Sequence, residues 1–496
     1  MSDLFISREN AEAGLLDLAT YIGERIKSSD GHAEAMNAVI PMYLAKNEVD
    51  LAAELANAVD DPFSRDKLLT LVAERCAQID DVDYALQLIG SIDDHGIRSQ
   101  AYERVGVLRA AAGDAETALS ISDQLSHPDF ILAEIAVKKA EGNDPDGARA
   151  ALSEIGFATA KVSAMEHIAD VHLRTSESEK AVEWLDLAAE TASNIEHDEE
   201  RIRTVCEIGN RFIEAKRNDK AITTFDAARE YSERLDNTHR DHFLATCAVG
   251  FLYAGSSDLA ENALDLVTDK TQMSSALLNF ARCAWESDEK EAALETLDEA
   301  YEILRSQRES ETRDSRSKNR LMTNIAVQFA GFGKTERAVE IARENPDPEE
   351  ETSCLAQIAQ ILVAQDEGEL ARQTVNEIDD DADRLQALIG IADAHLKKKN
   401  AEVAIDLLNE AASLAEEIPQ LGARSMALNG IAARLAMQGK IDEARDLEIE
   451  NLSVILQIKD ASSRSALLVG VSEVSDTSKL DLANYSGELI RKLIGP

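Results

Sequence analysis

The chain has 496 residues and a net charge of −43, so a nucleic acid or an anionic membrane is not an expected partner, because both require clustered Lys and Arg. A chain of this length exceeds the size at which one hydrophobic core stops growing, and several domains or a repeat array are therefore expected. Aromatic residues make up only 4% and there are eight prolines, which favours closely packed helices over a β-sandwich and argues against long disordered regions.

The 94 acidic residues are spread along the chain and are not concentrated in one tail. One interpretation is a solvated acidic surface like that of proteins from halophilic microbes. The excess of Arg over Lys, 31 to 20, also resembles the composition of such proteins. The other interpretation is an acidic receptor for a basic partner. The even distribution favours the first interpretation.

The N-terminal segment predicts an amphipathic helix over residues 8–27. Its apolar residues recur at helical spacing: Leu15, Leu16, Ala19, Ile22 and Ile26. We expect residues 1–32 to form an N-terminal capping helix that covers the end of an array. The segment lacks the basic region and continuous apolar core of a secretory signal, and no window approaches about 18 consecutive apolar residues, so no transmembrane span is expected.

The cysteines are odd in number, lie far apart and form no CxxC motif: Cys76, Cys206, Cys247, Cys283 and Cys354. Each falls inside the expected first helix of a repeat unit. We expect them to be buried, reduced thiols that act as small apolar residues. Because reduced thiols indicate a reducing compartment, the protein is expected to be cytoplasmic.

A unit of two short helices, helix A and helix B, recurs along the chain. An Ala that opens each helix B occurs at intervals of mostly 33 residues, with one of 30, four of 39–40 and one of 45. A period of about 20–50 residues indicates a solenoid. The thirteen positions are Ala52, Ala85, Ala118, Ala148, Ala181, Ala221, Ala260, Ala293, Ala338, Ala371, Ala404, Ala444 and Ala483.

Two positions relative to this Ala support the unit. Twelve residues before it, eleven of the thirteen residues are Ala or Gly, which predicts a close approach of two helix axes. Five residues before it, nine of the thirteen are Gly, Asn or Asp, the residue types that end a helix in a left-handed turn. The short turn then makes helices A and B antiparallel neighbours. The nine turn residues are Asn47, Asp80, Gly113, Asn143, Gly255, Asp288, Gly333, Asp366 and Gly439.

Helix B is expected to be short in the 33-residue intervals and about two turns longer in the 39–40-residue intervals. Pro62, Pro128 and Pro348 each lie ten residues after the Ala, where the next unit should begin. The unit around Ala483 fails both positional tests, as terminal repeats do where one face meets water. We therefore divide the chain into an array over 33–470 and a degenerate last repeat with a C-terminal cap over 471–496.

The longest interval, Ala293 to Ala338, contains the most basic run of the protein, residues 305–320. The favoured interpretation is an extended helix B followed by a solvated loop. The alternative is a contact site for an acidic partner or for the acidic surface of another copy of this chain. The cations of the run are Arg305, Arg308, Arg313, Arg316, Lys318 and Arg320.

The unit at 201–231 resembles the tetratricopeptide repeat. That repeat has a large residue, a Leu-Gly pair or its equivalent, an aromatic residue, and later Ala, an aromatic residue and Ala. The matching residues are Val205, Ile208, Gly209, Phe212, Ala221, Phe225 and Ala228, whereas Lys216 stands where the repeat usually has Gly. The resemblance covers roughly residues 33–495 and implies an all-α, right-handed α-solenoid of about thirteen antiparallel helix pairs, with N- and C-terminal capping helices.

Catalytic and metal signatures are absent from the sequence: it has no GxGxxG, P-loop, HExxH or GxSxG motif, and no cofactor is expected. His167 and His172 are five residues apart, a poor spacing for one shared metal. His239, Asp241 and His242 have the spacing to face one direction, but an exposed helix start is the favoured interpretation.

The resemblance implies that helix A lines a concave face and that residues beside its core positions contact a ligand. Arg and aromatic residues are the usual anchors of interfaces. An alternative is that Trp285 packs between units and that the arginines pair with nearby acids. The implied partner-binding residues are Arg203, Asn210, His242, Tyr253, Arg282, Trp285 and Arg320.

These observations predict a non-enzymatic scaffold that binds a protein or an extended peptide on the helix-A face. Two further hypotheses stand beside it. One is a self-assembling structural protein, in which the acidic faces of one copy meet the basic run 305–320 of another. The other is a regulatory tetratricopeptide-like protein that changes conformation when it binds a peptide.

Overall fold

The architecture is that of a computed structural model, which describes residues 4–236, 238–307 and 314–495. Over these residues the chain forms 29 helices and no strand, so the prediction of an all-α helical repeat is confirmed. The helices belong to two compact units. We call Met1–Val105 together with Leu355–Pro496 the terminal unit, and Gly106–Cys354 the central unit.

Twelve helix pairs run from α3–α4 to α25–α26. Helix A of each pair is α3 (Ser29–Ala45), α5 (Pro62–Gln78), α7 (His95–Ala111), α9 (Asp129–Glu141), α11 (Ala158–Arg174), α13 (Asp198–Glu214), α15 (Arg240–Tyr253), α17 (Lys270–Glu286), α19 (Ser315–Gly331), α21 (Pro348–Ala364), α23 (Asp381–Lys397) and α25 (Leu421–Met437). Helix B of each pair is α4 (Val49–Asn57), α6 (Val82–Gly90), α8 (Ala115–Ser122), α10 (Pro145–Glu154), α12 (Ser178–Ala192), α14 (Asn218–Glu233), α16 (Ser257–Leu264), α18 (Lys290–Arg305), α20 (Thr335–Arg343), α22 (Gly368–Asn376), α24 (Ala401–Ala415) and α26 (Ile441–Gln457).

Five further helices precede and follow these pairs: α1 (Arg8–Ala13), α2 (Leu15–Gly23), α27 (Ala461–Ser478), α28 (Leu482–Tyr485) and α29 (Gly487–Ile494). The single helix expected over 8–27 was wrong in one respect. Gly14 has an extended backbone (φ −142°, ψ 141°) and separates α1 from α2. The sequence pattern missed this break because the apolar spacing continues across it.

The turn between helices A and B has the predicted left-handed backbone. All nine turn residues expected from their type have positive φ, and so do Ser176, Lys216 and Lys399 at the equivalent position of other pairs. The next backbone N–H closes the turn, as where Arg217 N donates to Phe212 O (2.8 Å). This hydrogen bond holds even a Lys in a conformation that costs a residue with a Cβ roughly 1–2 kcal/mol.

The small residues do mark close helix contacts. The Ala that opens helix B has no exposed surface in the twelve pairs from α3–α4 to α25–α26. At Gly209, twelve residues before Ala221, a Cβ atom would lie 2.7 Å from Phe225 Cζ. A Cβ at Gly250 would lie 2.3 Å from Phe225 Cε1. The Phe225 ring of α14 therefore fills the space against both α13 and α15, and neither glycine leaves room for a larger residue.

The lengths of helix B follow the interval lengths, as predicted. Short intervals give α4, α6, α20 and α22 nine residues each, whereas the 39–40-residue intervals give α12, α14, α24 and α26 between 15 and 17 residues. The two additional turns carry further buried residues, such as Ala188 and Ala192 in α12. Long second helices therefore bury a wider apolar stripe.

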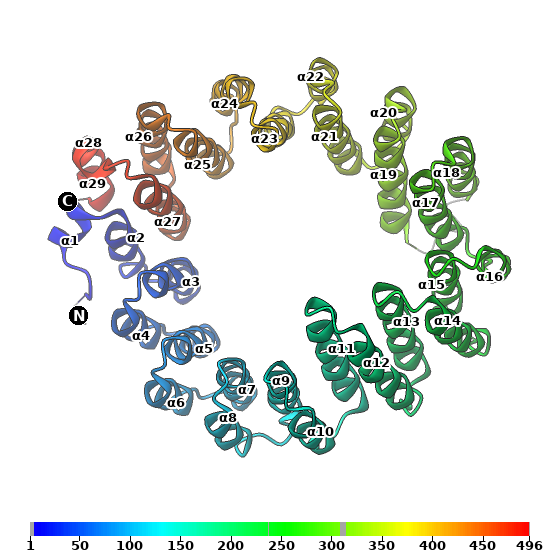
Figure 1. Ribbon diagram of the computed structural model, residues 1–496. Helices are drawn as coiled ribbons and strands as arrows, with labels where there is room; N and C mark the ends of the chain where they lie inside the picture. Colours follow the sequence, from blue (N-terminus) through cyan, green and yellow to red (C-terminus); the bar gives the residue numbers. More distant parts are fainter. Residues whose placement is uncertain (1–3, 237, 308–313, 496) are drawn as a thin grey trace. The chain divides into compact units, whose positions relative to one another are not determined.

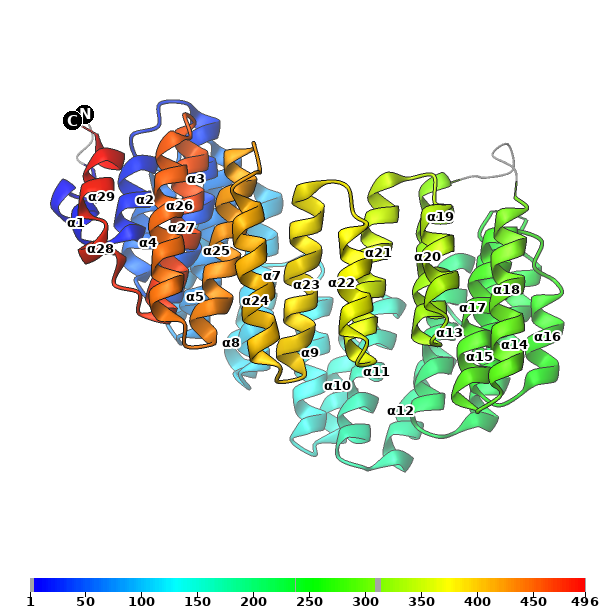
Figure 2. The same cartoon turned by 90° about the horizontal axis from the view of Figure 1, so that it is seen from above.

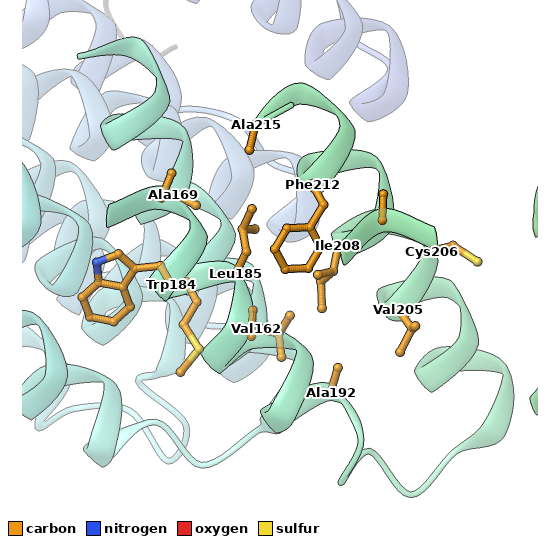
Figure 3. Packing of buried hydrophobic residues seen from close by; sticks show 14 of the residues in the cluster. Val162, Ala169, Trp184, Leu185, Ala192, Val205, Cys206, Ile208, Phe212 and Ala215 are labelled. Atoms are coloured by element: carbon orange, nitrogen blue, oxygen red, sulfur yellow. The ribbon is translucent and has the colours of Figure 1, made fainter. Parts of the chain in front are cut away.

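The core of the central unit passes continuously from one helix pair to the next. Figure 3 shows Ile208 and Phe212 of α13 directed toward Leu185 of α12 and Ala169 of α11, and all four side chains are at most 1% exposed. Each pair therefore covers the apolar face that its neighbour cannot bury alone, which is the physical basis of repeat architectures.

In the terminal unit, the first and last helices of the chain pack against each other, as both ribbon views show (Figures 1 and 2). Helix α27 contacts both α2 and α3, and every residue of α2 except Asp17 is buried. The Ser465 hydroxyl of α27 donates to Ala19 O of α2 (2.8 Å), and Lys46 pairs with Asp476 (2.8 Å). The two segments expected to cap separate ends of an array thus contact each other.

Buried aspartates link successive helix pairs. In the central unit, Asp129 of α9 accepts hydrogen bonds from Gly156 N (3.0 Å) and Phe157 N (2.9 Å), directly before α11. Asp66 of α5 makes the same contacts to the two residues before α7 (3.1 and 2.8 Å). These carboxylates satisfy backbone donors at the start of the next helix A, where a helix leaves its first N–H groups without partners.

All five cysteines carry free thiols, and four of them are buried as predicted; Cys283 is half-buried. Cys206 and Cys247 lie on neighbouring A helices of the central unit, with 4.0 Å between their sulfur atoms. Among the described helices, none combines the length and apolar composition needed to cross a bilayer.

Candidate functional site

The predicted partner-binding residues all lie on A helices of the central unit. Figure 1 shows α11 and α13 on one side of this unit and α12 and α14 on the other, and contacts between α11 and α13 and between α13 and α15 make the A helices one layer. Six of the seven residues are exposed, and Trp285 is half-buried. The seven are Arg203 and Asn210 on α13, His242 and Tyr253 on α15, Arg282 and Trp285 on α17, and Arg320 on α19.

Tyr253 and Arg282 form the best-defined part of this face. The Tyr253 side chain is 38% exposed, and Arg282 Nη2 donates to Asn279 Oδ1 (2.6 Å) on the same helix. Partial burial raises the pKa of Tyr253, and the positive charge of Arg282 opposes this rise. The phenol and the guanidinium are therefore close enough to interact, and both remain accessible from outside the protein.

The Trp285 ring has a structural partner. It stacks on Phe332 with 4.1 Å between ring centroids and 12° between ring planes, and Lys290 Nζ lies 5.6 Å from the Trp285 centroid. The stacking joins α17 to the residue after α19, the next helix A. Trp285 therefore packs between units, as the alternative interpretation holds, and its replacement would disturb the array itself.

The arginines of this face do not pair with nearby acidic residues, as the alternative interpretation would require. Across the described parts of the chain, no carboxylate forms an ion pair with Arg203, Arg282 or Arg320, although the chain carries 94 acidic residues. Arg203 and Arg282 are exposed on α13 and α17. These two cations are available to an incoming group with acceptor atoms.

Arg320 lines a separate recess of about 870 Å³ at the start of α19. Its walls are mixed in charge and consist of Asp314, Arg316, Ser317, Arg320, Asp347, Pro348, Glu349 and Glu350. Glu350 also accepts a hydrogen bond from the Thr323 hydroxyl (3.0 Å). The structure thus places Arg320 apart from Tyr253 and Arg282 and beside acidic residues of its own chain.

Two of the four described cations of the basic run 305–320 have partners within the chain. Arg305 lies at the end of the long α18, as predicted, and its Nε is 3.5 Å from a Glu344 oxygen. Lys318 Nζ donates to Gln307 O (2.8 Å). Arg308 and Arg313 lie outside the described residues.

The histidine pairs noted in the sequence have different surroundings. His172 is buried and its Nδ1 lies 2.8 Å from a Glu177 oxygen, whereas His167 lines a recess. Asp241 accepts from Thr268 N and Asp269 N (2.7 Å each), so its carboxylate links α15 to α17. Burial alone would raise the pKa of Asp241, but these hydrogen bonds lower it overall. The carboxylate between the two histidines at 239 and 242 thus has a structural role.

Sequence reasoning missed a second feature of the helix-A layer, a recess of about 620 Å³ between three successive A helices. We call it the α9–α13 recess. Its lining residues are Val137 of α9, His167, Asp170, Leu173 and Arg174 of α11, and Glu214 of α13. No sequence signal marked this feature, because two His, one Asp and one Arg on α11 do not by themselves reveal a hollow.

Comparison with known proteins finds no family model and no curated protein that matches the chain. Solved structures that it resembles include aspartyl phosphate phosphatase F from Bacillus subtilis, with 13% identity, 80% of this chain and 96% of that chain covered, and a TM-score of 0.29. A Rap protein complexed with competence and sporulation factor shares 11% identity over 79% of this chain and 99% of that chain (TM-score 0.28). A signal transduction ATPase with a tetratricopeptide repeat sensor from Pyrococcus horikoshii shares 12% over 88% and 64% (TM-score 0.23). Because these identities are 13% or lower, the function of this chain has to be argued from its own residues.

Proposed function

We propose that the protein is a non-enzymatic scaffold that binds a protein or an extended peptide on the helix-A face of the central unit. The observation that supports this proposal is the pair of Tyr253 and Arg282. In a chain of net charge −43, Arg282 is exposed, pairs with no described carboxylate and lies near a partly exposed Tyr. Tyr and Arg are enriched at the energetic centres of interfaces, because one buries a large rigid ring and the other donates several hydrogen bonds.

The chemistry of the patch favours a segment with acceptor groups. Arg203 and Asn210 on α13 and His242 on α15 extend the same exposed face with further donors. The His242 ring is placed by Gln272, whose Oε1 lies 3.2 Å from Nδ1. An acidic or carbonyl-rich extended peptide would meet these donors one helix at a time, as repeat proteins present an extended surface.

The test is a double substitution, Tyr253→Ala with Arg282→Ala, that leaves Trp285 in place because of its stacking on Phe332. The wild type and the variant would be used to capture partners from extracts of the native organism at its native salt concentration, with quantitative mass spectrometry. Arg234→Ala, at an exposed arginine directly after α14 in the other layer, is the control for loss of a surface arginine. We expect loss of a specific partner with the double variant only, while circular dichroism remains unchanged. Equal capture by all three proteins would overturn the proposal.

Self-assembly through the basic run is less well supported. Arg305 and Lys318 are engaged inside their own chain, and Arg320 lies beside Asp347 and two glutamates. A molecular mass in solution that falls to that of one chain only at high salt would favour self-assembly over the scaffold.

A further inference from the structure

A buried carboxylate without a hydrogen-bond donor lies beside the α9–α13 recess. The Glu166 side chain of α11 is only 9% exposed, and its Oε1 has no hydrogen-bond partner among the described residues. Burying such an oxygen without a donor costs free energy that water would otherwise offset. Glu166 precedes the recess-lining Asp170 by one helical turn, so the two residues project from the same face of α11.

The charges around Glu166 are predominantly negative. Glu207 and Arg211 of α13 and Asp170 of α11 act on its carboxyl group. Arg211 is already shared, because its Nη1 lies 3.1 Å from Asp170 and 2.9 Å from Glu214. One guanidinium is therefore shared among three carboxylates, those of Asp170, Glu214 and Glu166.

Arg174, the other cation of the recess, does not neutralise the excess negative charge around Glu166. Arg174 is 72% exposed, and its nearest carboxylate is that of Glu141 on α9, 4.0 Å away. It thus extends out of the recess toward solvent and toward α9. The interior keeps an excess of acceptor atoms.

The apolar part of the recess restricts the kind of cation that fits. Val137 of α9 and Leu173 of α11 line it beside the charged groups. An aliphatic chain can pack on these two side chains while its charged end reaches the carboxylates, as Lys and Arg side chains do on protein surfaces. Within the described parts of the chain, no group of three or more His, Cys, Asp or Glu residues is placed to hold a metal ion. An organic cation is therefore the better fit.

We propose that the α9–α13 recess binds a Lys or Arg side chain of a partner polypeptide, whose stem packs on Val137 and Leu173 and whose cationic end donates to Glu166. This site goes beyond the proposed function, because it takes a positive group and lies apart from the Tyr253 and Arg282 patch. A donor from the partner would satisfy the buried Glu166 oxygen, and charge-assisted hydrogen bonds of this kind are the strong ones.

The titration of Glu166 supplies an independent readout. Burial raises its pKa to about 7, and the negative charges of Glu207 and Asp170 add to the rise while Arg211 opposes it. On α9 and α12, which also pack against α11, no described group adds to this effect. A bound cation must compete with the proton, so binding should strengthen as the pH rises through about 7.

The experiment titrates the full-length protein with three capped pentapeptides, Gly-Gly-X-Gly-Gly with X as Arg, Lys or Gln, and follows the peptide signals by NMR. We expect the Arg and Lys peptides to bind, the Gln peptide not to bind, and Glu166→Gln to weaken binding by about tenfold or more. The control Glu183→Gln removes one exposed carboxylate of α12 and the same unit of charge, and should leave binding nearly unchanged. Equal weakening by both variants would mean non-specific attraction to an acidic protein and would overturn the proposal.

Two further measurements distinguish loss of this site from loss of folding or of the scaffold surface. If Glu166→Gln alters the circular dichroism spectrum, the pH dependence of wild-type binding decides, and binding that does not rise with pH overturns the proposal. If the Glu166→Gln variant is folded and keeps the pH dependence of wild-type binding, the proposal is also overturned. The Tyr253→Ala, Arg282→Ala protein should bind the Arg peptide like the wild type, which separates a failure of this site from a failure of the proposed scaffold surface.

Discussion

Replacing Glu448 by Gln should stabilise the terminal unit in a pH-dependent way. Glu448 of α26 has no exposed surface. Its Oε2 accepts from Asn451 Nδ2 (3.0 Å), and the side-chain amide of Asn429 lies against Oε1. Burial raises the pKa of Glu448 to about 7, and the hydrogen bond from Asn451 opposes the rise. Gln has almost the same shape and cannot ionise, and the Asn429 amide can turn its oxygen toward the Gln NH2 group.

The magnitude follows from the difference between the folded and unfolded chain. At pH values between 4.5 and about 7, folded Glu448 keeps a proton that the unfolded chain has released. The free energy of unfolding therefore falls as the pH rises through this window, and it is fully retained only below pH 4.5. At about 1.4 kcal/mol for each pKa unit, the free energy of unfolding of the wild type falls by about 3 kcal/mol by neutral pH. The Glu448→Gln variant does not undergo this fall, because its side chain does not titrate.

Hydrogen–deuterium exchange with mass spectrometry measures this effect locally, which matters because a repeat protein can unfold in stages. Protection of peptides from α25 to α27, corrected for intrinsic exchange at each pH, gives the opening free energy of the region around Glu448. Glu402→Gln on the exposed side of α24 is the control for loss of a charge. The reasoning is refuted if the opening free energies of the wild type and of Glu448→Gln change with pH in parallel. It is also refuted if Glu402→Gln raises the opening free energy as much as Glu448→Gln does.

Two further predictions concern a close helix contact in the central unit and the exposure of the cysteine thiols. Gly209→Ala should lower the free energy of unfolding by about 1–3 kcal/mol, because its Cβ would lie 2.7 Å from Phe225 Cζ. Gly422→Ala, with no atom within 4 Å, should cost nothing or stabilise by up to about 1 kcal/mol, and equal effects in denaturant titrations would contradict the packing argument. Brief treatment of the native protein with iodoacetamide should label half-buried Cys283 before the four buried cysteines, and mass spectrometry showing earlier labelling of any buried thiol would contradict this order.

Much of the fold was predictable because it repeats. Each helix pair has the same position for a buried Ala and the same position for a residue in a left-handed turn. Both positions could therefore be recognised by comparing the repeats within the chain. Ser176, Lys216 and Lys399 were not predicted, because Ser and Lys are not residue types that favour the left-handed conformation. They adopt it because the hydrogen bonds around the turn require it. The contact between α2 and α27 was not predictable, because nothing periodic connects segments so far apart.

The candidate sites were less predictable than the fold, because exposure depends on neighbours from other pairs. The sequence pattern placed Tyr253 and Arg282 on the helix-A face, but it could not show that Trp285 stacks on Phe332 from the next pair. Glu166 illustrates the same limit. Many glutamates of this acidic chain occupy A helices, and only the positions of α9 and α13 make this one buried and short of a donor.

The contact between α2 and α27 also sets the order in which the terminal unit can form. Ser465 and Ala19, which share a hydrogen bond, are 446 residues apart in the chain. At about 5–20 residues per second, the ribosome needs roughly 20 to 90 s to make the intervening segment. During that time α2 has emerged without the helix that covers its apolar face. The central helix pairs can fold on their neighbours as they appear, whereas the first helices of this protein must be kept from aggregating until the last ones arrive.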